Sequence, residues 1–415
     1  MAYGSMRQLR RYADKVFAKD ARLGRMSDER VHPVLPLAAL LSTWQWALIR
    51  RTPSTEQVGD LLLDPRWRAR LGLRPEQGGS PDRLAEVLDG LSREEWDEMM
   101  LEDFFRARRA GILTDGGLYG KRCAALDLNE LFQSEKTHCD QCQVREKTVK
   151  DEKGEKHLVP EYYHQAVALV WVSGAIPFVI GGEVLKPGEG ELTAALRLLD
   201  RLLPRLGKSL DLVLGDALYG CRPFFKAVCG AGLEGLAISS GKTEMDQEIE
   251  LLMQTDPPRR VAGMEVALWE MESEAWSAEL KRLLRVIHCE RRYDAPAWKH
   301  ERQQLRVVTS VPVEILPAGQ GWKVGRSRWG IENGTFNTLT RDYALTHNYH
   351  HSVPALLALL AMRAFACFLV LAYHRHPTAR SHHAPARFLT WFNTVVVEDW
   401  VRYLDEGLLP DRPAG

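Results

Sequence analysis

Three acidic residues of this 415-residue chain stand where a carboxylate can leave a packed element and reach a shared site. Asp127 and Asp216 each end a short apolar run that predicts a β-strand, and Glu332 closes the segment 328–332, RWGIE. On a helix, Arg328 and Glu332 would share one face because they are four residues apart. Carboxylates that meet in space bind hard divalent ions, and a guanidinium beside them suits a phosphate. A surface ion pair on an amphipathic helix is the plainer alternative for Arg328 and Glu332.

The elements around these acids predict an α/β fold with a mixed sheet. The acids fall at the ends of strands and on a helix, where a side chain can leave the core. The order of strands and helices matches a ribonuclease-H-like (RNase H-like) sheet flanked by helices, in which acidic residues stand at neighbouring strand ends. The predicted elements are strands at 122–128, 162–173 and 175–181, a helix at 191–206, a strand at 210–214, a helix at 223–229 and strands at 233–239 and 305–311.

The remaining stretches divide the chain into further regions. The first 115 residues predict short helices and a DNA-binding region, residues 140–157 a polar loop, and residues 241–305 a charged, mainly β insertion. The predicted divisions are an N-terminal helical region at 1–115, the first part of the catalytic core at 116–240, the insertion at 241–305, the last strand and the Glu332 helix at 306–375, and a tail at 376–415 with a helix at 386–404.

Composition sets limits on the class of protein. Hydrophobic residues make up 45% of the chain and charged residues 27%, which supports a large folded core. Lys plus Arg equals Asp plus Glu at 55 each, so a nucleic-acid surface must be local. The seven cysteines are uneven in spacing and the first residues are charged, from which we expect a reduced, cytoplasmic protein. Residues 354–373 are apolar enough for a membrane span, but Arg363 at their centre favours a buried core helix.

The N-terminal residues predict a helix from Met6 to Leu23 that ends at Gly24. Cations recur along it at helical spacing and would form a stripe able to follow a DNA backbone. A solvated outer face, diluted by Asp14 and Asp20, is the alternative. The stripe consists of Arg7, Arg11, Lys15, Lys19 and Arg22.

With these residues in place, the chain resembles the DDE transposases of bacterial insertion sequences, in the subgroup with an insertion before the catalytic glutamate helix. The resemblance covers roughly residues 30–375 in element order. Its motifs are Leu126-Asp127, the segment 213–220 (VLGDALYG), and the segment 328–332 followed by Phe336.

The resemblance implies a function and its partners. Asp127, Asp216 and Glu332 would bind Mg²⁺ or Mn²⁺, and Arg328 would lie near DNA phosphate. The reaction would be cleavage at transposon ends and attack of the freed 3′-hydroxyl on target DNA. The partners would be double-stranded DNA and a second copy of the chain, with no membrane.

Two departures from the family leave other interpretations open. Gly325 stands where relatives usually have tyrosine, and Leu339 where they usually have lysine. A domesticated or inactive DNA-binding descendant is therefore one rival, and an RNase H-like nuclease that does not join strands is another. Such enzymes often stack a tryptophan of the insertion on a flipped base, and the candidates are Trp269, Trp276 and Trp298.

A second metal site is predicted from cysteine spacing. His138, Cys139 and Cys142, with His157 or His164 downstream, offer ligands for a structural Zn²⁺ ion. Two reduced thiols in a loop are the alternative. The later histidines at 347, 350 and 351 are expected to make polar contacts near the substrate groove or in a loop, with metal binding as their alternative.

Overall fold

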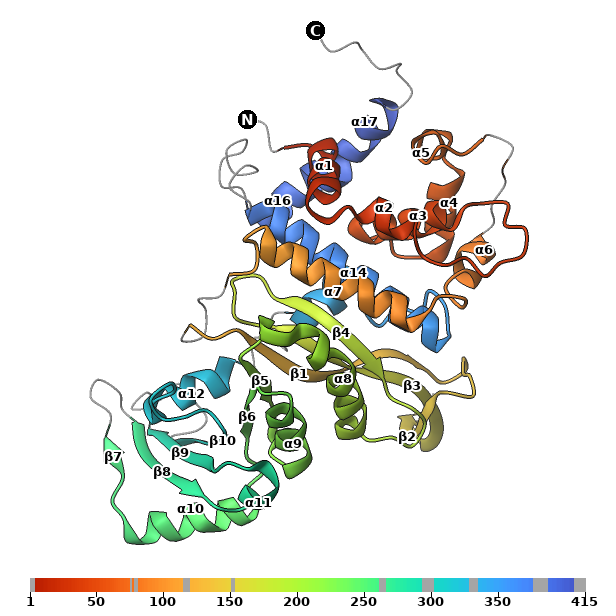
Figure 1. Ribbon diagram of the computed structural model, residues 1–415. Coiled ribbons are helices and arrows are strands. Elements are labelled where there is room, and N and C mark those ends of the chain that lie inside the picture. Colours follow the sequence, from red (N-terminus) through yellow and green to blue (C-terminus); the bar gives the residue numbers. More distant parts are fainter. Residues whose placement is uncertain are drawn as a thin grey trace.

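The computed structural model shows an N-terminal group of helices, a central mixed sheet and an inserted region at the far end of that sheet (Figure 1). The first and last helices that the structure describes, α1 (Met6–Phe17) and α17 (Asp399–Glu406), contact each other. The structure describes residues 4–74, 77, 81–114, 120–150, 154–260, 266–292, 302–327, 335–375 and 387–406.

The N-terminal region is helical, and several of its helices begin at capping residues. The Ser54 hydroxyl accepts a hydrogen bond from the backbone N–H of Gln57, and Ser92 accepts one from Glu95. These bonds satisfy donors that the first turn of a helix leaves open. The helices are α1 (Met6–Phe17), α2 (Lys19–Leu23), α3 (Leu37–Ile49), α4 (Thr55–Leu63), α5 (Pro65–Arg70), α6 (Pro81–Glu86) and α7 (Arg93–Arg109).

The prediction of one helix from Met6 to Leu23 is wrong. Ala18 adopts a left-handed conformation with φ of 48°, which ends α1 and starts α2. The backbone N–H of Ala18 donates to the Asp14 carbonyl at 2.9 Å, as at a helix C-terminus. Helical spacing therefore stops at Phe17, and the cations of α1 and α2 do not form one stripe.

The central sheet confirms the predicted RNase H-like arrangement. In the described residues it contains ten strands in the order β2-β3-β1-β5-β6-β10-β9-β8-β7, and β4 also pairs with β3. β1 is antiparallel to β3 and parallel to β5, and β5 is parallel to β6. Helix α8 connects β4 to β5, and α9 connects β5 to β6. The elements are β1 (Cys123–Ser134), β2 (Gln143–Lys150), β3 (Lys156–Trp171), β4 (Phe178–Val184), α8 (Glu191–Leu206), η1 (Gly207–Ser209), β5 (Leu212–Gly215), η2 (Ala217–Tyr219), α9 (Arg222–Gly230) and β6 (Glu234–Ile238).

Two adjacent glycines of β4 allow helices to approach both faces of the sheet. A Cβ atom on Gly181 would lie 2.6 Å from Leu202 of α8, and one on Gly182 would lie 2.6 Å from Leu360 of α14 (Val353–Arg375). Successive residues of a strand face opposite sides, so α8 covers one face of β4 and α14 the other. Helix α7 also contacts β4 and α14.

Helix α14 is the predicted core helix. It is long and apolar enough to cross a membrane by length and composition, but 94% of its most apolar window is buried inside the protein. Arg363 at its centre is buried and donates to the carbonyl oxygens of Leu345 at 2.8 Å and His347 at 3.0 Å. These hydrogen bonds give both terminal nitrogens of the guanidinium a partner inside the core and tie the helix to the loop that precedes it.

The insertion forms strands, as predicted, but they extend the central sheet. β10 pairs antiparallel with β6, and β9, β8 and β7 follow outward. Helix α10 begins at a capping box in which Thr243 and Asp246 exchange hydrogen bonds. The elements are α10 (Glu244–Thr255), β7 (Arg259–Arg260), β8 (Val266–Ser273), α11 (Ser277–Leu280), β9 (Leu284–Arg292), β10 (Arg302–Thr309), α12 (Ala318–Ser327) and α13 (Asn337–Tyr343).

The prediction of a loop at 140–157 is wrong. These residues include β2 and the start of β3, which form an antiparallel ribbon. Glu161 of β3 pairs with Arg145 and Lys147 of β2 at 2.5 and 2.7 Å. Cross-strand ion pairs stabilise a ribbon that has little apolar surface, and its polar sequence concealed it.

The predicted helix at 386–404 is divided in the structure. Its described part consists of α16 (Phe388–Phe392), a π-helical turn η4 (Asn393–Glu398) and α17 (Asp399–Glu406). Trp400 of α17 packs against Trp67 of α5 with ring centroids 5.4 Å apart. The tail is therefore joined to the N-terminal region.

Candidate functional site

The parallel pairing of β1 and β5 brings Asp127 and Asp216 to the same level of the sheet. The register pairs Ala124 with Val213 and Ala125 with Leu214. The pairing of β1 with β5 ends there, and the same register continued by two residues would bring Asp127 opposite Asp216 across 89 residues of sequence. Asp216 directly follows β5, but the prediction that Asp127 ends a strand is wrong, because β1 continues to Ser134.

A tight turn fixes the Asp216 carboxylate. Asp216 caps η2, and its Oδ1 accepts a hydrogen bond from the backbone N–H of Leu218 at 2.8 Å. Gly215 is required just before it, because a Cβ atom there would lie 2.4 Å from the Cβ of Tyr219. Gly220 is required after it, since its Cβ would lie 2.6 Å from the Ile238 carbonyl. The sequence GDALYG therefore holds one carboxylate in a folded-back turn.

A buried phenol joins the two aspartates to a third acid. Tyr219 is fully buried, and its hydroxyl donates to Oε1 of Glu191 at 2.7 Å. Burial raises the pKa of Tyr219, and the negative charges of Glu191, Asp216 and Asp127 raise it further. All three carboxylates therefore lie close to one phenol. No motif in the sequence marks this contact of Glu191.

Asp127 itself lies inside the sheet. It is 7% exposed, and its Oδ1 accepts a hydrogen bond from the backbone N–H of Leu128 at 3.2 Å. Asp216 is half-buried. Paired carboxylates at such a position have the hard oxygen donors that Mg²⁺ and Mn²⁺ prefer.

The predicted third ligand, Glu332, and its partner Arg328 lie outside the described residues. The flanking elements α12 and α13 are described. Helix α12 packs against β6, β8, β9 and β10, and α13 packs against α14. The segment 328–334 connects these two helices.

The two residues that depart from the family pattern, Gly325 and Leu339, both pack against neighbouring elements. A Cβ atom on Gly325 would lie 3.1 Å from Val307 and 3.3 Å from Leu305, so this face of α12 lies close against β10. Leu339 of α13 is fully buried, and with Ala364 of α14 it lines a small cavity. A tyrosine or a lysine at these positions would meet the core of this protein.

The N-terminal cations are divided between the surface and the core. Arg7, Arg11 and Lys15 are exposed. Lys19 and Arg22 are buried and both pair with Asp103 of α7, Lys19 at 2.6 Å. The prediction of an exposed stripe is therefore wrong for Lys19 and Arg22, because the break at Ala18 turns them inward.

The tryptophans proposed for base stacking have protein contacts. Trp269 is half-buried and donates to the Asp256 carbonyl at 3.0 Å. Trp276 is half-buried and lies near Phe225, with ring centroids 6.4 Å apart. Trp298 lies outside the described residues.

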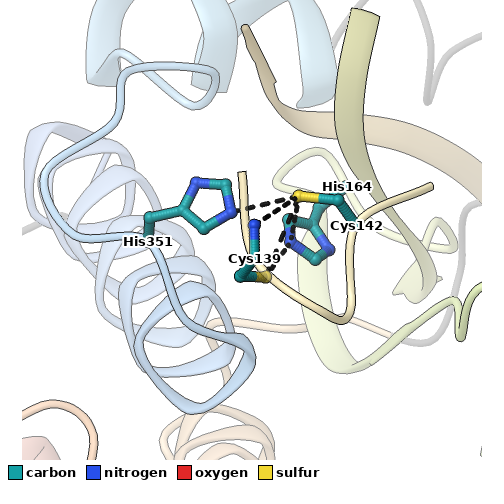
Figure 2. Close-up of side chains that lie close together, drawn as sticks. All are labelled: Cys139, Cys142, His164 and His351. Carbon is teal, nitrogen blue, oxygen red and sulfur yellow. Dashed lines mark hydrogen bonds between the residues drawn. The ribbon is translucent and has the colours of Figure 1, made fainter. Parts of the chain in front are cut away.

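The predicted cysteine pair belongs to a four-residue cluster, but His138 is outside it. Cys139, Cys142, His164 and His351 place one ligand atom each within 4.8 Å of one another (Figure 2). His138 is exposed and stacks on Tyr162 at 4.5 Å.

The other histidines named from the sequence are also elsewhere. His157 is exposed at the start of β3. His350 lies 2.8 Å from the Asp89 carboxylate, and His347 packs on Tyr349.

The sheet order defines an RNase H-like domain, in which Asp127 lies on β1 and Asp216 directly follows the adjoining β5. Comparison with protein families gives the particular group: residues 184–369 match the model of the transposase DDE domain. The match supports a DDE transposase of the insertion-sequence type. The matched range includes Asp216 and Glu332, and Asp127 lies upstream of it on β1. No curated protein matches the chain significantly.

Proposed function

We propose that this transposase cleaves DNA at the ends of a mobile element and joins the freed 3′-hydroxyl to target DNA. The observation that carries the proposal is the parallel β1–β5 register, which, if continued two residues beyond Ala125 and Leu214, would bring Asp127 within β1 opposite Asp216 just after β5. Glu332 is the proposed third ligand, and Arg328 the proposed contact to DNA phosphate.

The acids suit a metal-dependent phosphoryl transfer. Two divalent ions about 4 Å apart supply activation of the attacking oxygen and charge stabilisation at the leaving oxygen. Asp127, held within the sheet, and Asp216, held by the backbone of Leu218, provide ligands whose positions are set before DNA binds. Hard carboxylate oxygens favour Mg²⁺ or Mn²⁺.

Double-stranded DNA is the proposed partner, bound as transposon ends and as target. Arg7, Arg11 and Lys15 of α1 remain exposed and available to phosphate, whereas Lys19 and Arg22 do not. The proposal includes two copies of the chain that act together on paired ends. It also places the protein in the cytoplasm. Light scattering of the protein–DNA complex tests the dimer.

The proposal is tested with purified full-length protein and supercoiled DNA that carries the ends of the element. Mg²⁺ or Mn²⁺ should support nicking at the ends and joined products, and Asp127→Asn should abolish both while DNA binding remains. Asp200→Asn, which changes an exposed carboxylate on α8, is the matched control and should react normally. Wild-type cleavage by Asp127→Asn would refute the assignment.

The packing of Gly325 and Leu339 favours one second candidate, a descendant that binds transposon DNA without transposing. In relatives these positions handle the DNA end, and here they contact the core. Specific binding of the ends with no nicking in Mn²⁺ would support this alternative. Nicking without joined products would instead indicate a nuclease.

A further inference from the structure

We propose that Cys139, Cys142, His164 and His351 bind one zinc ion in a closed site that fastens the β1–β2 loop and β3 to the entrance of α14. The four ligands come from three separate parts of the chain (Figure 2). Cys139 and Cys142 lie between β1 and β2, His164 is on β3, and His351 lies just before α14.

The interatomic distances fit a tetrahedral ion. The two Sγ atoms are 3.8 Å apart, and each lies 3.4 Å from Nε2 of His164. Nε2 of His351 lies 3.2 Å from Sγ of Cys142. A tetrahedral zinc with Zn–S bonds of about 2.3 Å and Zn–N bonds of about 2.0 Å places two sulfurs about 3.8 Å apart, and a sulfur and a nitrogen about 3.5 Å apart.

The local backbone is arranged for two thiolates. The N–H of Cys142 donates to the Cys139 carbonyl at 3.1 Å, which closes a tight turn between the cysteines. The N–H of Cys139 donates to Sγ of Cys142 at 3.3 Å, a bond that stabilises negative charge on sulfur. The separation of 3.8 Å is far beyond the S–S bond of about 2.05 Å in a disulfide.

Burial and donor chemistry indicate zinc and exclude a catalytic role for it. His164 is fully buried and Cys142 is 6% exposed, whereas Cys139 and His351 are partly exposed. Two thiolates and two imidazoles in a tetrahedron suit zinc, whereas oxygen ligands suit magnesium. Four protein ligands leave no open coordination position for substrate.

The site would connect parts of the fold that flank the acidic site. His164 of β3 is the register partner of Phe132 on β1. Phe132 is five residues beyond Asp127, a separation of roughly 17 Å along a strand. Cys142 and His351 are 209 residues apart in sequence, so the ion would close a very long loop. Metal binding of this kind contributes directly to folding free energy. The proposed ion would therefore fix the extension of β1 against the helix that follows α13.

The first test is the metal content of the full-length protein purified with a thiol reductant. We expect about one zinc per chain, and after exchange the d–d absorption of tetrahedral Co²⁺ with a thiolate charge-transfer band. Folded, reduced protein that binds neither metal, or an octahedral Co²⁺ spectrum without the thiolate band, would overturn the proposal.

Matched variants test which residues bind the ion. Cys142→Ser and His351→Gln should reduce zinc from about one per chain to below about a tenth. His138→Gln and His350→Gln change the residues next to Cys139 and His351 and should retain the metal. Unchanged zinc content and Co²⁺ spectrum in His351→Gln would exclude the connection to α14.

A measurement on the unmodified protein keeps the proposal testable if the variants do not fold. Zinc should protect Cys139 and Cys142 from alkylation, and chelation should expose them, whereas Cys221 should react equally in both states. A chelator that leaves the alkylation of Cys139 and Cys142 unchanged would overturn the proposal.

Discussion

The acidic site and the Cys/His cluster differ in how the fold assembles them. Asp127 and Asp216 are brought toward each other by the register of two parallel strands, with Asp127 buried within β1 and Asp216 half-buried just after β5. The cluster of Cys139, Cys142, His164 and His351 depends on a loop, a strand and the approach to a distant helix. It is partly buried and offers a full set of four ligands.

This difference suggests that the acidic residues serve the reaction and that the Cys/His cluster serves stability. A site at strand ends leaves room for substrate, and removing one carboxylate leaves the surrounding packing intact. In a closed site with soft ligands, protein side chains occupy all four coordination positions of the ion. The ion therefore stabilises the fold and has no position for substrate. Variants of the acidic residues should therefore lower activity and leave thermal stability nearly unchanged. Variants of the Cys/His cluster should mainly lower thermal stability.

The largest expected effect is on activity at the acidic site. Asp216→Asn keeps the shape of the side chain and removes its charge, and we expect cleavage of transposon ends to fall by about 10³-fold or more. The melting temperature should change by no more than about 2 °C, and zinc content should be unchanged. Parallel cleavage assays and thermal melts measure both. Loss of zinc in Asp216→Asn would contradict the separation of the two sites.

The reverse effect is expected at the cluster. Chelation of zinc, or His351→Gln, should lower the melting temperature by about 5–10 °C, because the ion constrains distant parts of the chain. Cleavage measured well below the melting temperature should retain a measurable fraction of wild-type activity. His350→Gln is the control for a neighbouring histidine. A complete loss of cleavage in folded His351→Gln would assign the cluster a role in the reaction.

The two sites also differ in how far the sequence predicts them. Asp127 and Asp216 each follow or lie in short apolar runs, so the sequence located both beside strands, but it could not show that β1 continues past Asp127 to Ser134. The cysteine spacing predicted half of the cluster, and His164 was one of two downstream histidines offered as a further ligand. His351 joins it only through the packing of α14, 209 residues from Cys142, and no local pattern reports such a contact. His138 was wrongly included because sequence proximity says nothing about side-chain direction.

Other differences between the predicted and the observed structure have similar physical causes. The left-handed Ala18 has no marker such as glycine, so the helix break and the inward turn of Lys19 were not visible in the sequence. The ribbon of β2 and β3 is stabilised by ion pairs in place of an apolar pattern. The insertion strands were predicted as a separate unit, whereas backbone pairing with β6 continues the sheet.

A smaller effect is expected when the turn that holds Asp216 is crowded. Gly215→Ala would force the new methyl group to within 2.4 Å of Tyr219, and the shift should cost about 1–3 kcal/mol of stability and reduce cleavage. Gly230→Ala, at the end of α9, meets no atom within 4 Å and should be neutral or slightly stabilising. Denaturant unfolding compares the two variants. Equal stabilities would show that the turn has room for a side chain.

The smallest effect is expected at Tyr219, which touches the acidic group without being a predicted ligand. Tyr219→Phe removes the hydrogen bond to Glu191 and should cost about 1 kcal/mol, with cleavage reduced by less than about tenfold. Because burial and three nearby carboxylates raise the pKa of Tyr219, the phenol stays protonated at neutral pH and donates throughout. The reduction should therefore be the same factor from about pH 6 to pH 9. A pH–rate profile measures it, and a factor that grows with pH would mean that the wild-type phenol ionises and takes part in proton transfer.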